Sequence, residues 1–304
     1  MSGTWNGFSG NPDAIGSSLA QALRYVAAWR GKTVVVKFGG SAVDSADTGT
    51  IPEDLVLLQQ AGVRTILVHG GGPEITREIE SSGRSSRFVD GLRVTDAATM
   101  EIVERVLGGT VNKRLVNLIA RAGGRAVGVS GKDAQMIHAR PHERASDLGF
   151  VGEVDRVEPR IVEVLLEEGF LPVVASLGVG ADGHAYNVNA DTAAAALAVA
   201  VRADKLVLLT DVPGIYREID GGRELLSELS PAEARTLVTA GVVTRGMLPK
   251  VEAALAAVEG GVPSAHIVGA ETQHSLLLEL FTRTGIGTMI HPVAPEPLAL
   301  ASSA

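Results

Sequence analysis

Cysteine is absent from this chain of 304 residues. Its absence excludes disulfide bonds, thiolate metal sites and cysteine nucleophiles, and it is compatible with a reducing cytosol. The first residues also lack the basic and apolar segments of a signal peptide. The longest purely apolar run, residues 193–201, is far shorter than the roughly 20 residues that span a bilayer. We therefore expect a soluble, cytoplasmic protein without a membrane partner.

Positive charge is in deficit, because 27 Lys and Arg face 35 Asp and Glu and give a formal net charge of −8. Proteins that bind nucleic acid by neutralising phosphates carry the opposite balance, so we expect no nucleic-acid partner. A small anionic substrate is still compatible, since a local cationic pocket does not need a basic protein. Hydrophobic residues make up 45% of the chain, which is enough for a large core and excludes global disorder.

Several catalytic signatures are also missing. The chain has no G-x-x-x-x-G-K-[ST] pattern, no H-R-D or D-F-G set of the protein kinases, and no G-x-S-x-G. His138 and His142 are four residues apart, but Pro141 lies between them and no H-E-x-x-H occurs. We therefore predict no metal site built from protein side chains.

What the sequence does contain is an alternation of apolar strand-like runs and helical periodicity. Predicted strands lie near residues 33–36, 64–68, 126–129, 171–175, 205–209, 265–268 and 287–290. Predicted helices lie near residues 14–30, 96–122, 231–240, 247–260 and 273–282, and another starts after residue 191. This order predicts an α/β fold, a three-layer αβα sandwich with a mostly parallel central sheet. The turn-rich stretch 177–184 suggests a boundary between two lobes, 31–178 and 179–304, after an N-terminal extension over 1–30.

Glycine-rich turns follow two of these strands, at residues 37–41 (KFGGS) and 69–73 (HGGGP). Glycines at a strand end let backbone N–H groups approach an anion closely, and a helix N-terminus adds favourable dipoles. Both turns should lie at the carboxyl ends of the strands, where such sheets bind ligands. The first turn is either a cradle for a phosphate or a tight turn with a lysine that reaches to the surface.

Three later segments can likewise be interpreted either as ordinary local structure or as part of a ligand site. Residues 187–191 (NVNAD) hold three polar side chains before a helix, of which a helix cap explains one. Residues 210–214 (TDVPG) are either an ordinary turn or the mouth of a nucleotide site. Lys250 falls in the first turn of a predicted helix, where a cation is disfavoured unless an anion is bound. The helix near 14–30 either packs on its own core or serves as an oligomerisation arm.

Taken together, these blocks resemble the amino acid kinase family, and within it the acetylglutamate kinases. The similarity runs from about residue 31 to 290, and its markers are VKFGGS (36–41), VHGGGP (68–73), GLRVTD (91–96), VGVSGKD (127–133), NVNAD (187–191) and LTDV (209–212). The resemblance implies ATP with Mg²⁺ as cofactor and N-acetyl-L-glutamate as phosphoryl acceptor, in an early step of arginine biosynthesis.

The resemblance also implies roles for individual residues. Lys37 and Lys250 would stabilise the transferred phosphoryl group, with Asp191 orienting both lysines and Gly40 donating a backbone N–H. The N-lobe would bind the acceptor and form a dimer interface. The acceptor-binding residues would be Gly71, Gly72, Arg93, Asn187 and Asn189. The C-lobe would bind the nucleotide through Gly39, Thr210, Asp211, Gly214, Tyr216, Val242, Thr244 and Met247.

A helix before the first strand and the segment Gly285 to Thr288 resemble the arginine-inhibited, hexameric members of the family. The resemblance therefore implies L-arginine as an inhibitor and a homo-oligomer, either a hexamer built as a trimer of dimers or a dimer. The effector would contact Tyr25, His266, Glu279, Gly285 and Gly287. Two alternatives stay open: a related kinase acting on glutamate or a carrier-linked aminoadipate, and a sensor that binds the effector without catalysis.

Overall fold

The computed structural model describes residues 11–39, 49–219, 222–243, 246–282 and 285–292. Its centre is an eight-stranded sheet. Across the sheet lie, in order, β14 (Glu228–Leu229), β16 (Thr288–Ile290), β15 (Ala265–Gly269), β11 (Lys205–Thr210), β1 (Thr33–Phe38), β2 (Arg64–His69), β8 (Leu171–Ala175) and β5 (Ala126–Ser130). From β15 to β5 all neighbours are parallel, and β16 runs antiparallel to β15. The predicted mostly parallel sheet is confirmed.

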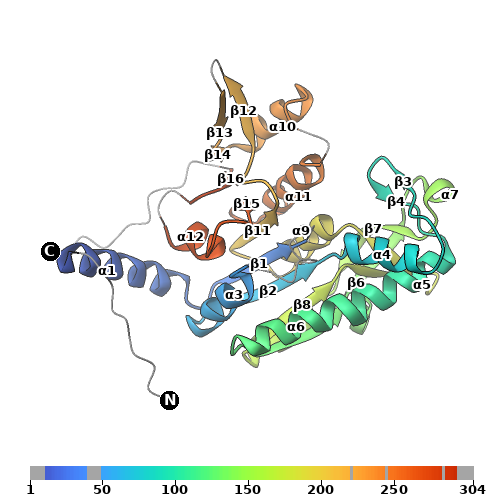
Figure 1. Ribbon diagram of the computed structural model, residues 1–304, viewed down its shortest axis with the longest axis horizontal. Helices are drawn as coiled ribbons and strands as arrows, with labels where there is room; N and C mark the ends of the chain where they lie inside the picture. Colours follow the sequence, from blue (N-terminus) through green and yellow to red (C-terminus); the bar gives the residue numbers. More distant parts are fainter. Residues whose placement is uncertain (1–10, 40–48, 220–221, 244–245, 283–284, 293–304) are drawn as a thin grey trace.

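Helices cover both faces of this sheet (Figure 1). The α-helices of the described residues are α1 (Pro12–Trp29), α3 (Ile51–Gln60), α4 (Gly72–Ser81), α5 (Ala97–Glu104), α6 (Asn112–Arg121), α7 (Ala145–Leu148), α8 (Arg160–Glu167), α9 (Ala190–Ala200), α10 (Pro231–Thr239), α11 (Leu248–Glu259) and α12 (Ser275–Phe281). No helix in the part of the chain that the structure describes is long and apolar enough to cross a membrane.

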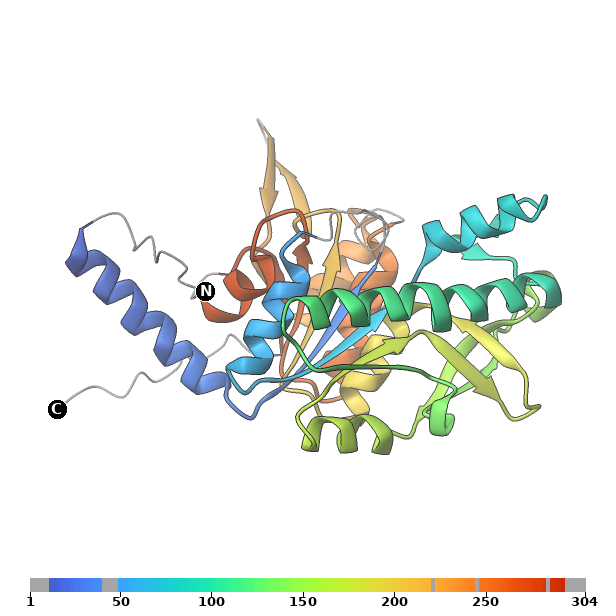
Figure 2. The same cartoon turned by 60° about the horizontal axis from the view of Figure 1, so that its bottom comes forward.

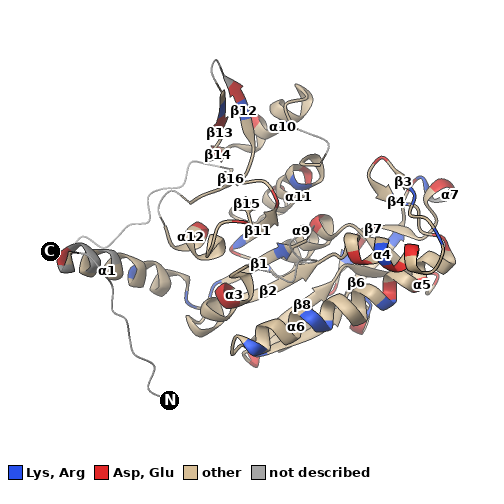
Figure 3. Cartoon of the chain, viewed as in Figure 1, with Lys and Arg blue, Asp and Glu red and all other residues tan. Residues whose placement is uncertain are grey.

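Two hydrophobic cores form because successive residues of a strand point to opposite faces. Val34 and Val36 of β1 pack with residues of α3, α5, α6 and α12, whereas Val35 packs with residues of α8, α9 and α11. All six residues of β1 are buried. Charged side chains are accordingly sparse on the central strands and gather on helices and hairpins (Figure 3).

A second, smaller sheet lies at one end of the molecule and α1 at the other, as Figures 1 and 2 both show. It is a closed barrel of β6 (Ile137–Pro141), β7 (Val151–Val157), β9 (Leu177–Gly180) and β10 (Ala185–Val188). Part of the predicted turn at 177–184 is therefore strand β9. Two hairpins complete the fold, β3 (Phe88–Val89) with β4 (Leu92–Arg93), and β12 (Tyr216–Ile219) with β13 (Gly222–Leu225).

The helix predicted over 96–122 is not a regular α-helix. A π-helical segment, Arg105–Val111, separates α5 from α6. Its wider turns hold Gly108 and Gly109, which apolar periodicity cannot distinguish from α-helical positions. The segment packs against the turn after β2, which opens helix α4.

Candidate active site

Three charged side chains meet at the carboxyl end of β1. Lys37 lies on β1, Asp191 in the first turn of α9 and Lys250 in the first turn of α11. The Lys37 Nζ is 2.8 Å from Asp191 Oδ1, and the Lys250 Nζ is 3.5 Å from Asp191 Oδ2. The side chains of Lys37 and Asp191 are only 8% and 7% exposed. The structure therefore brings together three of the four residues that the resemblance assigned to catalysis.

Local structure explains why Asp191 faces the lysines. Asn189 caps α9, and its Oδ1 accepts hydrogen bonds from the N–H groups of Asp191 at 2.8 Å and Thr192 at 3.2 Å. That cap fixes the first turn, in which the dipole favours a carboxylate. The oxygen of Asn189 is thus used by the helix, as the simpler interpretation of this segment predicted.

The cluster keeps an excess of positive charge. Burial by itself raises the pKa of Asp191, but the charges of Lys37 and Lys250 outweigh it and hold the pKa below its usual value. One ionised carboxylate therefore faces two amines. Lys250 is also placed at a helix N-terminus whose cap residue, Met247, makes no side-chain hydrogen bond. Both features favour an additional anion between the lysines.

The backbone after β1 leaves room for Lys37. A Cβ atom at Gly39 would lie 2.7 Å from the Lys37 Nζ and 2.9 Å from its Cε. A glycine is therefore required for the amine to turn back over the end of the strand. Gly40, for which we predicted a backbone contact to the phosphoryl group, lies outside the described residues.

The turn after β2 opens helix α4. A Cβ atom at Gly71 would lie 2.8 Å from Leu107 Cδ2 and 3.1 Å from Val111 Cγ2, both in the π-helical segment. Gly72 faces open space instead. The first N–H groups of a helix have no partner within the helix, so this end of α4 offers donors to an anion.

Arg93, on β4, lies beside this turn. Its guanidinium donates to the Gly72 carbonyl at 2.9 Å, to Thr76 Oγ1 at 2.8 Å and to Ser86 Oγ at 2.6 Å, and its Cζ lies 4.7 Å from the centre of the Phe88 ring. Arg93 is 7% exposed, and burial lowers its pKa. No carboxylate in the described ranges forms an ion pair with it. A buried cation of this kind suits an anionic ligand.

Asn187 approaches the same region from β10. Its Nδ2 lies 3.3 Å from Oγ1 of Thr95, a buried residue two positions after Arg93. The barrel and the β3–β4 hairpin thus meet where Arg93 and the α4 N-terminus are. Arg93 is held by Thr76 and Ser86, and sequence reasoning missed both. Single hydroxyl side chains far apart in sequence carry no pattern.

The residues predicted to bind nucleotide follow β11, the other neighbour of β1. Thr210 is buried at the end of β11 and donates to Asp211 Oδ1 at 2.9 Å. Gly214 is sterically required, because a Cβ there would lie 2.6 Å from Thr288 Oγ1. Tyr216 begins β12. Met247 is buried and Val242 is exposed, and Thr244 lies outside the described residues.

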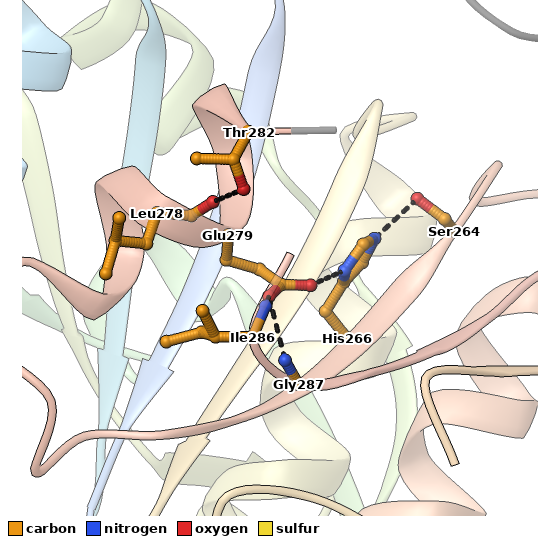
Figure 4. A network of polar contacts seen from close by, with 7 residues as sticks. All are labelled: Ser264, His266, Leu278, Glu279, Thr282, Ile286 and Gly287. Carbon is orange, nitrogen blue, oxygen red and sulfur yellow. Dashed lines mark hydrogen bonds and ion pairs between the residues drawn. The ribbon is translucent and has the colours of Figure 1, made fainter. Parts of the chain in front are cut away.

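A second polar cluster lies at the opposite, amino end of β11 and β15 (Figure 4). His266 Nδ1 contacts Glu279 Oε1, and Glu279 Oε2 accepts hydrogen bonds from the N–H groups of Ile286 at 2.7 Å and Gly287 at 3.1 Å. A Cβ at Gly285, whose φ is 61°, would lie 2.7 Å from Glu279 Oε2. Four of the predicted effector residues are thus together, and Tyr25 lies half-buried on α1.

The charges of this second cluster are nearly balanced. Burial lowers the pKa of His266 to about 4 and the pKa of Lys205 to about 8. Burial raises the pKa of Glu279, but the hydrogen bonds from His266 and from the N–H of Ile286, together with the charge of Lys205, bring the net pKa below its usual value. A neutral histidine therefore donates to an ionised glutamate near Lys205, which the Trp29 ring covers at 5.0 Å. Sequence reasoning missed Lys205, although a lysine that begins a buried strand is a usable signal.

The chain is similar to known proteins over most of its length. Residues 32–269 match the amino acid kinase family. The acetylglutamate kinase of Syntrophomonas wolfei is 48% identical over 273 residues, covering 90% of this chain and 95% of the relative. That of Halorhodospira halophila is 48% identical over 292 residues, covering 92% and 96%.

Solved structures give the same fold. The N-acetylglutamate synthase of Neisseria gonorrhoeae, complexed with coenzyme A and N-acetyl-glutamate, matches 91% of this chain with a TM-score of 0.80 and 30% identity. The same synthase complexed with coenzyme A and L-arginine has a TM-score of 0.77 and 28% identity. This chain spans 63% and 65% of those synthase chains. The carbamate kinase of Giardia lamblia bound to AMP-PNP, at 17% identity and a TM-score of 0.63, shows the fold alone.

Proposed function

Because this chain belongs to the amino acid kinase family, we propose that it transfers the γ-phosphoryl group of ATP to the γ-carboxylate of N-acetyl-L-glutamate. This is the activity of an acetylglutamate kinase, a phosphotransferase with a carboxyl acceptor, in arginine biosynthesis. The observation that carries the proposal is the buried Lys37–Asp191–Lys250 cluster, together with the N-terminus of α4 and Arg93, which forms no ion pair within the described residues.

The chemistry needs no general base. The acceptor is already a carboxylate at neutral pH, and its oxygen attacks the γ-phosphorus while the bond to the β–γ bridging oxygen breaks and ADP leaves. The transition-state charge is then spread over cations and oriented N–H groups. Lys37 and Lys250 supply the cations, and Asp191 holds both amines in place.

Mg²⁺ would enter with the nucleotide and neutralise its phosphate oxygens. The described residues contain no group of three acidic or histidine side chains that could hold a metal ion. A magnesium ion commonly keeps several waters and substrate phosphates as ligands. An ion delivered by ATP would therefore not need such a group of protein side chains.

The acceptor would bind at the carboxyl ends of the strands, on the side of the N-lobe (31–178). Arg93 would pair with one of its carboxylates, and the N–H groups of Gly71 and Gly72 would receive the other end. Asn187 would contact the acetylamino group, whereas Asn189 contributes through its cap of α9. ATP would bind on the C-lobe side (179–304), against Gly39 and Met247 and the residues of the turn after β11, namely Thr210, Asp211, Gly214 and Tyr216.

We further propose feedback inhibition by L-arginine at the second cluster. Glu279 offers a carboxylate to a guanidinium group, and Lys205 offers a cation to a carboxylate. A synthase with 28% identity to this chain was solved with L-arginine. Helix α1, with Leu23 65% exposed, would join dimers into a hexamer. Removal of residues 1–30 should then leave dimers in light scattering, and an unchanged mass would contradict this role of α1.

One assay tests the activity directly. ADP release is measured with N-acetyl-L-glutamate, with L-glutamate and without acceptor, each at saturating ATP and Mg²⁺. Release only with N-acetyl-L-glutamate supports the proposal. Faster release with glutamate or a carrier-linked aminoadipate would assign a related kinase instead. Calorimetric arginine binding without ADP release would indicate a sensor, and no inhibition by millimolar arginine would eliminate the effector site.

A further inference from the structure

A buried pair of polar side chains lies beneath the glycine turn of the candidate active site. His69 ends β2, and Asn112 begins α6 directly after the π-helical segment. Both residues are 0% exposed. The Asn112 Nδ2 lies 3.1 Å from His69 Nε2, and the His69 Nδ1 lies 2.9 Å from the Gly70 carbonyl oxygen. The roles assigned so far use neither residue.

The orientation of the Asn112 amide follows from its other neighbours. Its Nδ2 also lies 2.9 Å from the carbonyl oxygen of Val173 and 3.2 Å from that of Val129. Carbonyl oxygens only accept hydrogen bonds, so the nitrogen of the amide must face them. Its Oδ1 accepts from Lys113 Nζ at 3.0 Å. Asn112 therefore presents an N–H group to His69.

This orientation fixes the histidine tautomer. Because Nε2 receives a hydrogen bond from Asn112, it must be the unprotonated nitrogen, and the proton is on Nδ1. The Nδ1–H group then donates to the Gly70 carbonyl. Burial is the main cause that lowers the pKa of His69 to about 4; the contact with the Gly70 carbonyl raises the pKa, and the nearby cations Arg114 and Lys113 lower it. The ring is thus neutral at physiological pH.

Holding the Gly70 carbonyl also aims the next N–H group. In a trans peptide the carbonyl of Gly70 and the N–H of Gly71 point in opposite directions. The Gly71 carbonyl is held by the N–H of Ile75 at 2.9 Å, and the Gly72 carbonyl by Arg93 and Thr76. Every carbonyl of the turn therefore has a protein donor, and the direction of each following N–H is set.

We propose that His69, held in its Nδ1–H form by Asn112, is a positioning residue that aims the N–H of Gly71 at the carboxylate of the acceptor. This inference rests on the proposed kinase function. It also gives the π-helical segment a purpose, because that segment places Asn112 under β2 and supplies Leu107 and Val111 as the surface on which Gly71 packs.

Two substitutions at residue 69 separate the hydrogen bond to the Gly70 carbonyl from the contact with Asn112. In His69→Asn the amide nitrogen stands as many bonds from Cα as Nδ1, so a donor to the Gly70 carbonyl is kept. In His69→Gln the amide nitrogen corresponds to Nε2, so that donor is lost. We expect His69→Gln to raise the KM for N-acetyl-L-glutamate about tenfold, the effect of one misplaced hydrogen bond. His69→Asn should show a smaller rise, and neither variant should change the KM for ATP.

Gly128→Ala provides a test outside residue 69. A Cβ there would lie 1.9 Å from Asn112 Oδ1 and 2.8 Å from Lys113 Nζ, so the amide must move, although Gly128 lies on β5 and not in the glycine turn. The same selective rise in acceptor KM is expected. A merely structural role would lower the melting temperature and the active fraction but leave both KM values at the wild-type level, and that result would overturn the inference.

The tautomer has its own readout. In protein labelled with ¹⁵N-histidine, the signals missing from His69→Asn identify the His69 ring, and its shifts should report a neutral, Nδ1-protonated ring from pH 5.5 to 8. A proton on Nε2 would refute the inference whatever the activity. A wild-type enzyme that releases no ADP would instead refute the kinase proposal, so the two failures are distinguishable.

Discussion

The two polar clusters of this protein lie at opposite edges of the same parallel sheet, one at the carboxyl end of β1 and one at the amino ends of β11 and β15, and they differ in charge balance. At the carboxyl end, two lysines share one aspartate at 2.8 and 3.5 Å. At the amino end, a neutral histidine, an ionised glutamate and one lysine come together. The first cluster has a surplus positive charge and suits a phosphoryl group in transfer. The second is close to neutral and suits a ligand that carries both signs.

The difference shows how one sheet can carry two polar clusters of different charge balance at its two edges. β11 carries Thr210, a predicted nucleotide-binding residue, at its carboxyl end and Lys205 of the second cluster at its amino end, and its four residues in between are buried and apolar. A rigid strand of this kind transmits a shift at one end only as a movement of the whole element, together with the helices packed on it.

The largest expected effect is at the carboxyl end. Lys250→Ala and Lys37→Ala should each lower kcat by about 10²–10³-fold, because each removes one preorganised cation from the transition state. The measurement is ADP release at saturating substrates. Lys132→Met is a matched control, since Lys132 is also a lysine paired with a carboxylate, that of Glu104, but is no part of the cluster, and its kcat should equal that of the wild type. Unchanged turnover in Lys250→Ala would remove that residue from the mechanism.

At the amino end a substitution should affect inhibition. Glu279→Gln removes a buried negative charge that accepts two backbone hydrogen bonds, and we expect the arginine concentration for half-inhibition to rise about 10–100-fold. Each variant is compared with its own rate without arginine, which separates affinity from turnover. If the inhibition curve of Glu279→Gln coincides with that of the wild type, arginine does not bind at this cluster.

Sequence patterns predicted most of this architecture, because the central strands are apolar runs bounded by glycine turns. The Lys37–Asp191–Lys250 cluster was predicted from the resemblance to the amino acid kinases, and its residues lie at the end of one strand and in the first turns of two helices. The barrel strands β6, β7, β9 and β10 were not predicted. Strands such as β7 (VGEVDRV) mix charged and apolar residues, and their pairing depends on neighbours far away in sequence.

The support beneath the glycine turn was also beyond prediction. Nothing in the sequence distinguishes Asn112 from the other polar residues of a surface helix, and its burial depends on the π-helical shift before it. His69 was noticed only as the residue before three glycines. Side chains that act through a carbonyl oxygen leave no spacing signature, because their partners are backbone atoms of any residue type.

The two ends should contribute similarly to the pH dependence of stability. His69 and His266 both have pKa values of about 4 when folded and about 6.5 when unfolded. Between these values the unfolded chain binds more protons, so stability falls as the pH is lowered from 6.5 towards 4, by up to about 1.4 kcal/mol per pH unit for each histidine. Above pH 6.5 this contribution is complete.

Denaturant unfolding at pH 5, 6 and 7 measures this slope. Carboxylates with lowered pKa values, such as Asp191 and Glu279, add a dependence of the same sign at lower pH. The comparison is therefore between each variant and the wild type. His69→Asn and His266→Gln should each reduce the slope of the unfolding free energy against pH by up to about 1.4 kcal/mol per pH unit, which corresponds to one proton fewer taken up on unfolding. A wild-type slope in either variant would mean that the histidine concerned is already protonated in the folded protein.

The smallest expected effect distinguishes α1 as a regulatory element from α1 as an oligomerisation arm alone. The Trp29 ring covers the Lys205 amine at 5.0 Å, a contact that favours the charged amine by about 0.5–1 kcal/mol. Trp29→Leu should therefore lower the pKa of Lys205 below its value of about 8 and weaken arginine inhibition about 2–5-fold. The loss should be greater at pH 8 than at pH 7, because the amine is then more often neutral. Equal inhibition at both pH values in Trp29→Leu would show that the charge of Lys205 takes no part in binding arginine, and that α1 acts on the effector site only through assembly.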